Sequence, residues 1–566
     1  MRHLAWLALL PVLALAQGEV REPEAATGRI EQQKVVGSKL MMATANPLAS
    51  EAGFAMLRQG GSAVDAVIAA EMVLTLVEPQ SSGLGGGAFM LLWDQDKQRM
   101  QTLDARETAP KADTPELFME DGKPMDFFKA LVGGRSVGVP GLVKGFWEAH
   151  QHYGKLPWAK LFEPAIKLAK DGFEVSPRLA ELVRMEMNPG LKSSATAKDY
   201  FFPHGQPLKA GTLLKNPALA KTMEAIAKAG PKAFYEGELA EALVKTVRGH
   251  ATNPGQMTLA DLKDYQPVWR DVVCGPYRQY QVCSAPPPAG GLVVVQQLGI
   301  LNKLPALANW DVPAIHRFTQ ASRLAFADRN LYEGDPAFVE VPMAAMLDDS
   351  YLTRRSGLIG DADQPAVAGE LAPRALTKSP ELPSTSHLVA IDKDGNAVSM
   401  TASIEMGFGS TLMVGGFLLN NELTDFNFGA KDEQGRWVAN RVQGGKRPRS
   451  SMAPSMVLYQ GQLQGLIGSP GGSRIINYVT RTLVNVIDGG MDIQDAIAMP
   501  NVTNRNDYTA LEKGTVAEDW VEGLKARGHD VRLIDLNSGL QGFWRLPDGR
   551  WQGGADPRRE GKVLAE

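Results

Sequence analysis

The sequence predicts an α+β protein in which a helix-rich part precedes a strand-rich part. From about residue 140 to 260 the pattern is helical and alanine-rich, with Lys/Glu faces. After residue 386, short alternating apolar and polar runs follow one another, separated by turn residues. Residues 355–384, between the two parts, lose all periodicity and gather Pro, Ala, Ser and Asp, which predicts a linker.

Composition places the chain among large globular proteins. Its 566 residues are 44% hydrophobic and 22% charged, so it can bury large cores. The formal charge is -4, the isoelectric point is near 6.1, and no Lys/Arg cluster stands out. These values argue against nucleic acid as a partner.

The first sixteen residues have the pattern of a secretory signal peptide. Arg2 and His3 precede an apolar run, residues 4–16, which ends in the small-x-small sequence Ala14, Leu15, Ala16. The run is shorter than the roughly 20 residues that span a bilayer. We therefore expect export, with a periplasmic location, and keep an uncleaved membrane anchor as the alternative.

The two cysteines, Cys274 and Cys283, lie in what looks like two short strands around a turn. Because an exported protein meets an oxidising compartment, we favour a cross-strand disulfide over two buried free thiols.

Several helices are marked at their ends. Residues 49–58 are amphipathic and stop at Gly60, and Ser62 with Asp65 resembles a capping box that starts a long apolar helix ended by Pro79. Further helices are expected at residues 218–229, 237–248, 292–301, 315–329 and 475–487.

The strand pattern begins directly after the linker. Residues 387–391 and 397–404 alternate around the turn residues 392–395, which predicts a β-hairpin. Strands are also expected at residues 413–419, 456–459 and 463–468. The glycine-rich residues 83–88 lead into a strand at 89–93, the wrong order for a Rossmann nucleotide site, and indicate close backbone approach instead.

A search for chemistry first excludes common sites. The eight histidines form no HExxH, and there is no CxxC. These absences argue against a metal site.

The positive signal is Thr385, between the predicted linker and the first strand. An autocleaved nucleophile needs this placement, because we expect an accessible scissile bond there and a strand that fixes the new terminus. Cleavage before Thr385 would give it a free α-amine with an ordinary pKa of about 7.7 to 8.0, able to act as base for its own hydroxyl. Taken alone, a Pro-Ser-Thr sequence is more often a plain turn.

The surrounding motifs resemble the γ-glutamyltransferase family, also called γ-glutamyltranspeptidases or glutathione hydrolases, of the N-terminal nucleophile hydrolase superfamily. The resemblance covers nearly the whole mature chain. The matching segments are residues 60–66, 83–87, 104–110, 137–141, 286–291, 385–387, 394–398, 408–410, 419–426, 446–452 and 468–473.

The resemblance implies a four-layer αββα sandwich built from two autocleaved fragments. Cleavage before Thr385 would leave a large subunit, residues 17–384, and a small catalytic subunit, residues 385–566, packed together as a heterodimer. Thr385 would attack a γ-glutamyl amide such as glutathione to form an ester, which water or an amino-acid or peptide acceptor resolves. No cofactor is implied.

The resemblance implies catalytic roles for the residues that match the family's motifs. Thr385 matches the nucleophile, Gly471 and Gly472 match the oxyanion hole, and Ser403 stands where the family has a threonine that binds the nucleophile's amine. A Pro-Gly-Gly turn can present successive N–H groups because no side chain blocks approach.

Substrate-binding roles follow in the same way. Arg106 matches the arginine that pairs with the substrate α-carboxylate, for which a planar, always-charged fork is suited. Ser450 and Ser451 match a serine pair that holds the same carboxylate, and Glu422 with Asp425 match positions that receive the α-ammonium. The plain alternative for Arg106 is a surface arginine beside Asp104 and Glu107.

Two features depart from the better-known members. Glu405 stands where they have asparagine, so that three acids, Glu405, Glu422 and Asp425, would strengthen ammonium selection. Residues 427–445 hold Trp437 and no tyrosine where many members have a lid.

Two other readings remain open. A cephalosporin or glutaryl acylase, or a polyglutamate-processing member, would keep the fold and change the substrate. A secreted amino-acid or peptide binding protein would use Arg106 and the acids without chemistry and would remain one chain.

Overall fold

The computed structural model describes residues 29–371 and 384–566. The predicted signal peptide, residues 1–16, lies outside this range, as do residues 372–383 of the predicted linker. Within the described residues, no helix combines the length and apolar character needed to cross a membrane.

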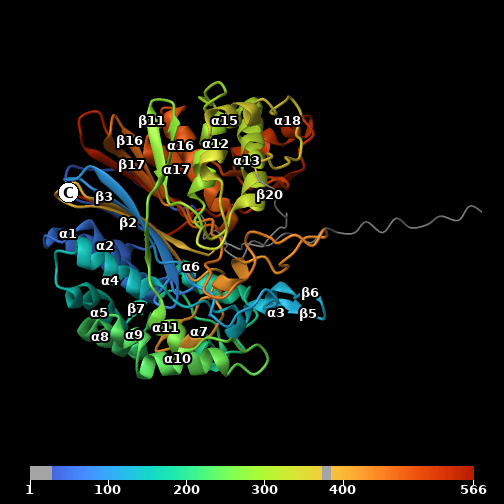
Figure 1. Cartoon of the computed structure of the whole chain (residues 1–566). Coiled ribbons are helices and arrows are strands. Elements are labelled where there is room, and N and C mark those ends of the chain that lie inside the picture. Colours follow the sequence, from blue (N-terminus) through green and yellow to red (C-terminus); the bar gives the residue numbers. More distant parts are fainter. Residues whose placement is uncertain (1–28, 372–383) are drawn as a thin grey trace, which may run out of the picture.

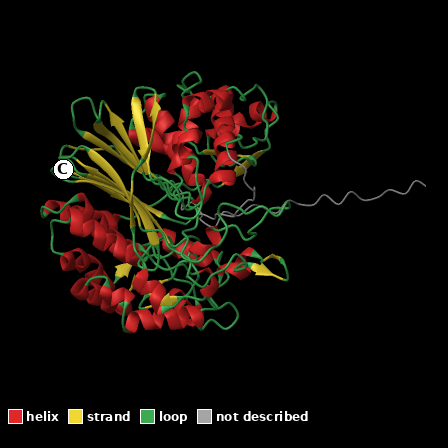
Figure 2. Ribbon diagram, viewed as in Figure 1, coloured by secondary structure: helices red, strands yellow, loops and turns green. Residues whose placement is uncertain are grey.

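Two seven-stranded sheets lie face to face at the centre of the molecule. The first has the order β23 (Lys562–Ala565), β2 (Met41–Thr44), β12 (Ser386–Ile391), β13 (Ala397–Ser403), β3 (Gly87–Asp94), β4 (Arg99–Asp104), β9 (Val268–Arg270). The second has the order β1 (Val35–Gly37), β22 (Trp551–Ala555), β21 (Gln541–Arg545), β17 (Gln462–Gly468), β16 (Ser455–Tyr459), β11 (Tyr280–Ser284), β10 (Val273–Tyr277). Figure 2 shows these strands with one group of helices to their right and another below them.

Apolar side chains at alternate positions along the strands fill the space between the two sheets. Leu91 and Val389 of the first sheet form one apolar cluster with Met456, Leu466 and Phe543 of the second. Neighbours of Leu91 and Val389 along the same strands, such as Met90 and Leu388, point to the opposite face and join the helices that cover it.

Helices cover both outer faces and complete four layers (Figure 1). The first sheet is covered by α1 (Pro47–Arg58), α2 (Ala63–Val77) and α4 (Leu142–Tyr153), with α5 (Glu163–Asp171) packed against α2 and α8 (Pro217–Ala229) packed against α5. The second is covered by α12 (Gly291–Leu301), α16 (Ile475–Ile487) and α17 (Ile493–Ala498), with α13 (Val312–Tyr332) packed against α12. The predicted αββα sandwich is confirmed.

Each sheet contains strands from both sides of the Ser384–Thr385 bond. In the first sheet, β12 pairs with β2 on one side and β13 pairs with β3 on the other. In the second, β16 pairs with β11 and β22 pairs with β1. Because these ladders interleave, the two parts of the chain share their cores and could not come apart without breaking both sheets.

The helix and hairpin predictions hold where local signals are strong. The Ser62 side chain accepts from the Asp65 amide and the Asp65 carboxylate accepts from the Ser62 amide, so the capping box starts α2. The β12–β13 hairpin has the expected antiparallel register. Helices α10 (Glu238–Arg248), α12, α13 and α16 lie within three residues of the expected bounds.

One strand prediction is wrong. Residues 413–419 do not form a single strand but two short ones, β14 (Met413–Val414) and β15 (Phe417–Leu418), paired antiparallel. Gly415 and Gly416 have φ values of 55° and 85°, and this left-handed pair turns the chain back on itself.

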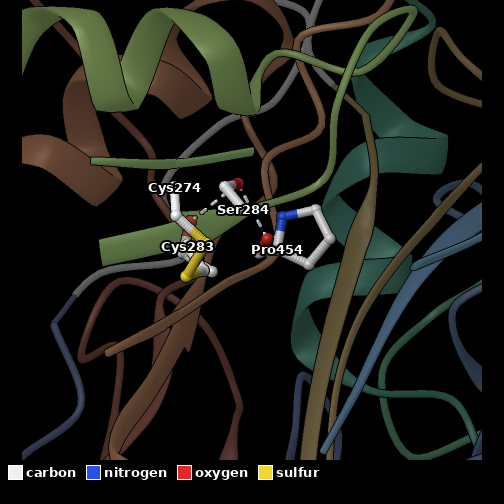
Figure 3. The surroundings of a disulfide bond; sticks show 5 residues. Cys274, Cys283, Ser284 and Pro454 are labelled. Atoms are coloured by element: carbon white, nitrogen blue, oxygen red, sulfur yellow. Dashed lines mark hydrogen bonds between the residues drawn. A yellow bond between two sulfur atoms is a disulfide. The ribbon is translucent and has the colours of Figure 1, made fainter. Parts of the chain in front are cut away.

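Cys274 and Cys283 are joined in a disulfide at one edge of the second sheet (Figure 3). They are directly opposite in the β10–β11 register, as the two-strand prediction required. Next to the bridge, the Ser284 hydroxyl donates to the Pro454 carbonyl at 2.9 Å, which ties β11 to the start of β16.

Candidate active site

Thr385 lies directly before β12, at the end of the first sheet. Its side-chain hydroxyl donates to the carbonyl oxygen of Ser384 at 2.6 Å. The Thr385 carbonyl accepts from Arg559 Nη1 at 3.2 Å, which anchors the residue from its other side. The hydroxyl is therefore held against the peptide bond that precedes it.

The Ser384–Thr385 bond is buried, and the expectation of an accessible bond is wrong. Ser384 is fully buried and Thr385 is 3% exposed. The Ser384 hydroxyl donates to the Gln80 carbonyl at 2.7 Å, so the bond lies against the chain that follows α2. An attack from within the molecule needs no access for an outside protease, so burial is compatible with self-cleavage.

Ser403, the last residue of β13, reaches the same peptide bond. Its hydroxyl donates to the Ser384 carbonyl at 2.9 Å and lies 3.3 Å from the Thr385 hydroxyl. Its position depends on the glycine run, because a Cβ at Gly86 would lie 2.1 Å from the Ser403 carbonyl oxygen. The close backbone approach predicted for residues 83–88 is confirmed.

Gly471 and Gly472 form the turn between β17 and α16. Their φ values are 132° and 55°, and a Cβ at Gly471 would lie 2.6 Å from the Tyr478 ring. A single 3-10 turn, Gly472–Arg474, then leads into α16. N–H groups at the start of a helix carry partial positive charge, which suits a developing oxyanion.

Arg106 follows β4 and is buried, so the alternative hypothesis that it is a surface arginine is wrong. Its guanidinium donates to the carboxylates of Glu422 and Asp425 and, through Nη2, to the Arg449 carbonyl at 3.0 Å. Burial acts to lower the pKa of Arg106, but the charges of Glu422, Asp425 and Glu107 outweigh it and hold the pKa above its ordinary value.

Glu422 and Asp425 are the ends of one 3-10 helix, η4 (Glu422–Asp425). Residues three apart in a 3-10 helix lie on one face, which explains why both carboxylates reach the same guanidinium. Burial raises the pKa of Glu422, against the charge of Arg106, and burial together with Glu422 raises the pKa of Glu107 well above its usual range. Burial and mutual repulsion thus oppose the simultaneous ionisation of Glu107 and Glu422, and the charge of Arg106 favours it.

Ser450 and Ser451 face this cluster from the loop before β16. The Ser451 hydroxyl accepts from Arg329 Nη2 at 2.8 Å, and the Ser450 hydroxyl accepts from the Met452 amide at 3.1 Å. Glu405 has a φ of 75°, and its carboxylate accepts from the Asn421 side chain.

The structure brings nearly all the predicted site residues around one cavity, here called the Arg106 cavity. It is lined by Arg106, Thr385, Ser403, Glu405, Glu422, Asp425, Ser450, Ser451, Met452, Gly472 and Ile475. Gly471 is the one predicted residue outside this lining, and it is covalently next to Gly472. Trp437 is 49% exposed and does not line the cavity.

Sequence reasoning missed some residues of the site. Met452 and Ile475 line the cavity, and Arg329 orients Ser451 from α13. Met452 follows the serine pair directly and Ile475 begins α16, so their positions beside motif residues were the available signal. Arg329 lies 122 residues before Ser451, and no pattern around it in the sequence indicated a role in the site.

The sandwich and its buried threonine define the fold of an N-terminal nucleophile hydrolase. A crystal structure of cephalosporin acylase from Bacillus halodurans superposes with a TM-score of 0.84 at 30% identity, covering 95% of this chain and 97% of the other.

The sequence model described as Gamma-glutamyltranspeptidase matches residues 49–566, and the chain belongs to this family. It is 36% identical to a glutathione hydrolase proenzyme of Bacillus subtilis strain 168, over 98% of this chain and 97% of that protein. It is also 34% identical to an acylase ACY 1 proenzyme of a Pseudomonas species, strain V22, over 96% of each.

Proposed function

We propose that this protein is a self-cleaving γ-glutamyl hydrolase and transferase whose nucleophile is Thr385. The observation that carries the proposal is the contact of the Thr385 hydroxyl with the Ser384 carbonyl, 2.6 Å apart, at the wall of a cavity that holds a buried arginine and three acids. The names of the relatives, glutathione hydrolase proenzyme among them, support the same activity.

Maturation uses the bond beside the nucleophile. The Thr385 hydroxyl oxygen attacks the Ser384 carbonyl carbon, the C–N bond breaks, and an ester joins the two parts. Water then hydrolyses the ester, which leaves a carboxylate at Ser384 and a free amine at Thr385. The Ser403 hydroxyl, 2.9 Å from the Ser384 oxygen, stabilises the negative charge that forms there.

Turnover repeats this chemistry on a substrate. The Thr385 hydroxyl attacks the γ-carbonyl of a donor such as glutathione, and the new α-amine takes the hydroxyl proton and gives it to the leaving amine. Gly471 and Gly472 present N–H groups to the oxyanion. Water, or an amino acid or peptide, then resolves the ester and frees Thr385.

The Arg106 cavity fits the free end of a γ-glutamyl group. Arg106, Ser450 and Ser451 receive the α-carboxylate, and Glu405, Glu422 and Asp425 receive the α-ammonium. An incoming carboxylate competes with Glu422 and Asp425 for the guanidinium, and an incoming ammonium favours the ionised form of Glu422. A zwitterion therefore satisfies both sides at once, whereas a single charge satisfies only one.

A glutaryl or cephalosporin acylase is the second candidate, because an acylase proenzyme and a cephalosporin acylase are among the similar proteins. A glutaryl group has no ammonium to offset the three acids of the cavity. Parallel assays with γ-glutamyl and glutaryl anilides separate the two functions, and we expect the γ-glutamyl anilide to be cleaved at least tenfold faster.

Self-cleavage is tested with a denaturing gel and intact masses of the purified protein. We expect two fragments, residues 17–384 and 385–566, which co-purify because both sheets contain strands of each. Thr385→Ala should remain uncut and inactive, and Thr385→Ser, which keeps a hydroxyl, should still be cut. An uncut Thr385→Ala protein with full activity would overturn the proposal, as would a single stable wild-type chain.

Export is proposed from the sequence of residues 1–16. We expect the mature protein in the periplasm, beginning at Gln17. N-terminal sequencing of the large fragment from fractionated cells tests this, and a fragment that begins at Met1 would contradict it.

A further inference from the structure

The turn of residues 471–474, here called the oxyanion turn, needs support from outside itself. Gly471 and Gly472 both have positive φ, and neither has a side chain that could pack and fix the direction of its N–H group. Donors stabilise an oxyanion well only when they already point at the place where its charge develops. The residues that hold this turn therefore decide how well its N–H groups can act.

A hairpin further along the chain lies against the oxyanion turn. It is formed by β18 (Val502–Asn504) and β19 (Thr509–Glu512), which pair antiparallel, and residues 505–508 form its tip. The Asn504 amide donates to the Asn477 side chain of α16 at 2.7 Å. The hairpin is thus fixed to the helix into which the turn leads.

Arg505, at the tip of this hairpin, contacts the oxyanion turn directly. Its Nη1 donates to the hydroxyl of Ser473, the residue after Gly472, at 2.7 Å. Its Nη2 donates to the Asp507 carboxylate at 2.9 Å, and the Arg505 amide donates to the same carboxylate at 3.2 Å. Asp507 therefore holds the planar guanidinium in the orientation in which Nη1 meets Ser473.

The next residue of the turn, Arg474, is held by the same hairpin. Its Nη1 donates to the Thr503 hydroxyl at 2.6 Å, and its Nη2 donates to the Tyr508 hydroxyl at 2.9 Å. The two residues that follow the glycines are thus both hydrogen-bonded to the hairpin. Their contacts also bring the positive charges of Arg474 and Arg505 to the turn, and positive charge there favours an oxyanion.

The hairpin tip is itself anchored on its other side. Asn506 Nδ2 donates to the Ala366 carbonyl, and Asn506 Oδ1 accepts from the Ala366 amide, each at 2.8 Å. Ala366 precedes Ser384 in the chain, so the tip lies between a segment of the part before Thr385 and the oxyanion turn. A tip bonded on both sides can hold the turn in one position.

We propose that Arg505 is a positioning residue that fixes, through Ser473, the direction of the Gly471 and Gly472 N–H groups during turnover. This inference rests on the proposed function. It concerns the reaction with the substrate and not maturation. In the described part of the chain, the Ser384 carbonyl accepts from the Thr385 and Ser403 hydroxyls and from no N–H group of the turn.

Arg505→Met tests the proposal, because it removes the donor and keeps a long side chain at a partly exposed position. We expect kcat for a γ-glutamyl anilide to fall about tenfold and KM to stay within about twofold, the pattern of a contact that acts in the transition state. Arg505→Lys can still donate to Ser473 and should recover most of kcat. Arg532→Met is the matched control, because Arg532 lies 4.0 Å from the centre of the Tyr508 ring but donates to Asp530.

A double-mutant cycle shows whether Arg505 acts through Ser473. Ser473→Ala removes the acceptor and should lower kcat about as much as Arg505→Met does. Adding Arg505→Met to Ser473→Ala should then cause little further loss, because both changes delete the same contact. Timed gels of fresh precursor should show self-cleavage at the wild-type rate in every variant, which also shows that each has folded.

The outcomes separate this inference from the proposed function. A wild type that does not cleave the anilide overturns the proposed function and this inference with it. With an active wild type, an Arg505→Met kcat equal to that of Arg532→Met overturns the inference alone, and so does a full additional loss in the Ser473→Ala background. Self-cleavage that slows in step with kcat would show that Arg505 supports the fold in general, and this result also overturns the inference.

Discussion

The hydroxyl of Ser403 lies 3.3 Å from that of Thr385, and both donate to the carbonyl oxygen of Ser384. The two residues come together because β12 and β13 form one hairpin, in which Ser386 is opposite Ala402 and the next position outward brings Thr385 to Ser403. A single local turn thus sets the distance between the proposed nucleophile and its partner.

Removal of the Ser403 hydroxyl should slow self-cleavage. Ser403→Ala deletes one donor to the Ser384 oxygen, a loss of about 1–3 kcal/mol in the transition state, or roughly fivefold to 150-fold in rate. Timed gels of freshly purified precursor measure this rate. Ser403→Thr restores a hydroxyl and should restore cleavage, so a Ser403→Ala protein that matures at the wild-type rate would exclude the role.

Arg106 should matter for both stability and donor binding. Arg106→Gln leaves the carboxylates of Glu422, Asp425 and Glu107 without their buried cation, and breaking such a buried pair costs about 3–5 kcal/mol. We expect a lower free energy of unfolding, measured with urea, and a large rise in the KM for a γ-glutamyl anilide.

A triple variant separates these two effects. Arg106→Gln combined with Glu422→Gln and Asp425→Asn removes the cation together with the two carboxylates that contact it, so stability should return in large part while donor binding should not. Recovery of the wild-type KM in this variant would show that none of these three side chains binds the donor.

Local signals in the sequence were sufficient for the elements that build the site but not for the contacts between them. The Ser62–Asp65 capping box and the turn at residues 392–395 place α2 and the β12–β13 hairpin, because their determinants lie within a few residues. The Arg106–Glu422 pair spans 316 residues, and no local pattern specifies it. The motif resemblance placed both residues in the site, yet assigned them to two different groups of a substrate, the α-carboxylate and the α-ammonium, rather than to each other.

The failed predictions have physical reasons of the same kind. Residues 413–419 read as one apolar strand, but the left-handed Gly415 and Gly416 reverse the chain within it. The Ser384–Thr385 bond lies next to a linker-like sequence, yet it is buried against the Gln80 carbonyl, a contact across 304 residues. Composition near a bond does not reveal which distant segment covers it.

Gly471 should be intolerant of a side chain. A Cβ there would meet the Tyr478 ring at 2.6 Å, and its φ of 132° is rarely adopted by other residues. Gly471→Ala should shift the N–H groups of the turn and lower kcat for a γ-glutamyl anilide by about a hundredfold, the cost of one misplaced oxyanion donor. Gly490→Ala is the control, because Gly490 also has positive φ but open space around its Cβ. Equal kcat values in the two variants would contradict the oxyanion assignment.

A buried histidine pair should make the protein less stable in acid. His316 Nε2 lies 2.8 Å from the Gly360 carbonyl, which can only accept, so this nitrogen carries the proton. His316 Nδ1 then accepts from His529 Nε2, and His529 Nδ1 accepts from the Thr509 hydroxyl, each at 2.8 Å. If both imidazoles were protonated, two N–H groups would face each other and the bond between the rings would be lost.

Burial lowers the pKa of His529 to about 4 and also lowers the pKa of His316. Asp363, 3.5 Å from His529, opposes this effect, as does Asp361 at His316, whereas Arg323 and Arg527 add to it. An unfolded histidine binds its proton near pH 6.5, well before the folded one. The unfolded state therefore binds more protons between about pH 6.5 and 4, and stability falls as the pH falls through that window.

The change of unfolding free energy with pH is best measured on the uncut Thr385→Ala chain, in which both halves stay covalently joined. We expect His529→Gln to remove about 1–2 kcal/mol of the loss in unfolding free energy between pH 7 and pH 5. Burial also raises the pKa of Glu71 to about 8, which acts in the opposite sense, so the difference between variants is the readout. His152→Gln, at an exposed histidine, is the matched control. His316 and Gly360 precede Ser384 in the chain, whereas Thr509 and His529 follow it, so these hydrogen bonds join the two parts. If His529→Gln left the pH dependence of the unfolding free energy unchanged, this contact would not be a source of that dependence.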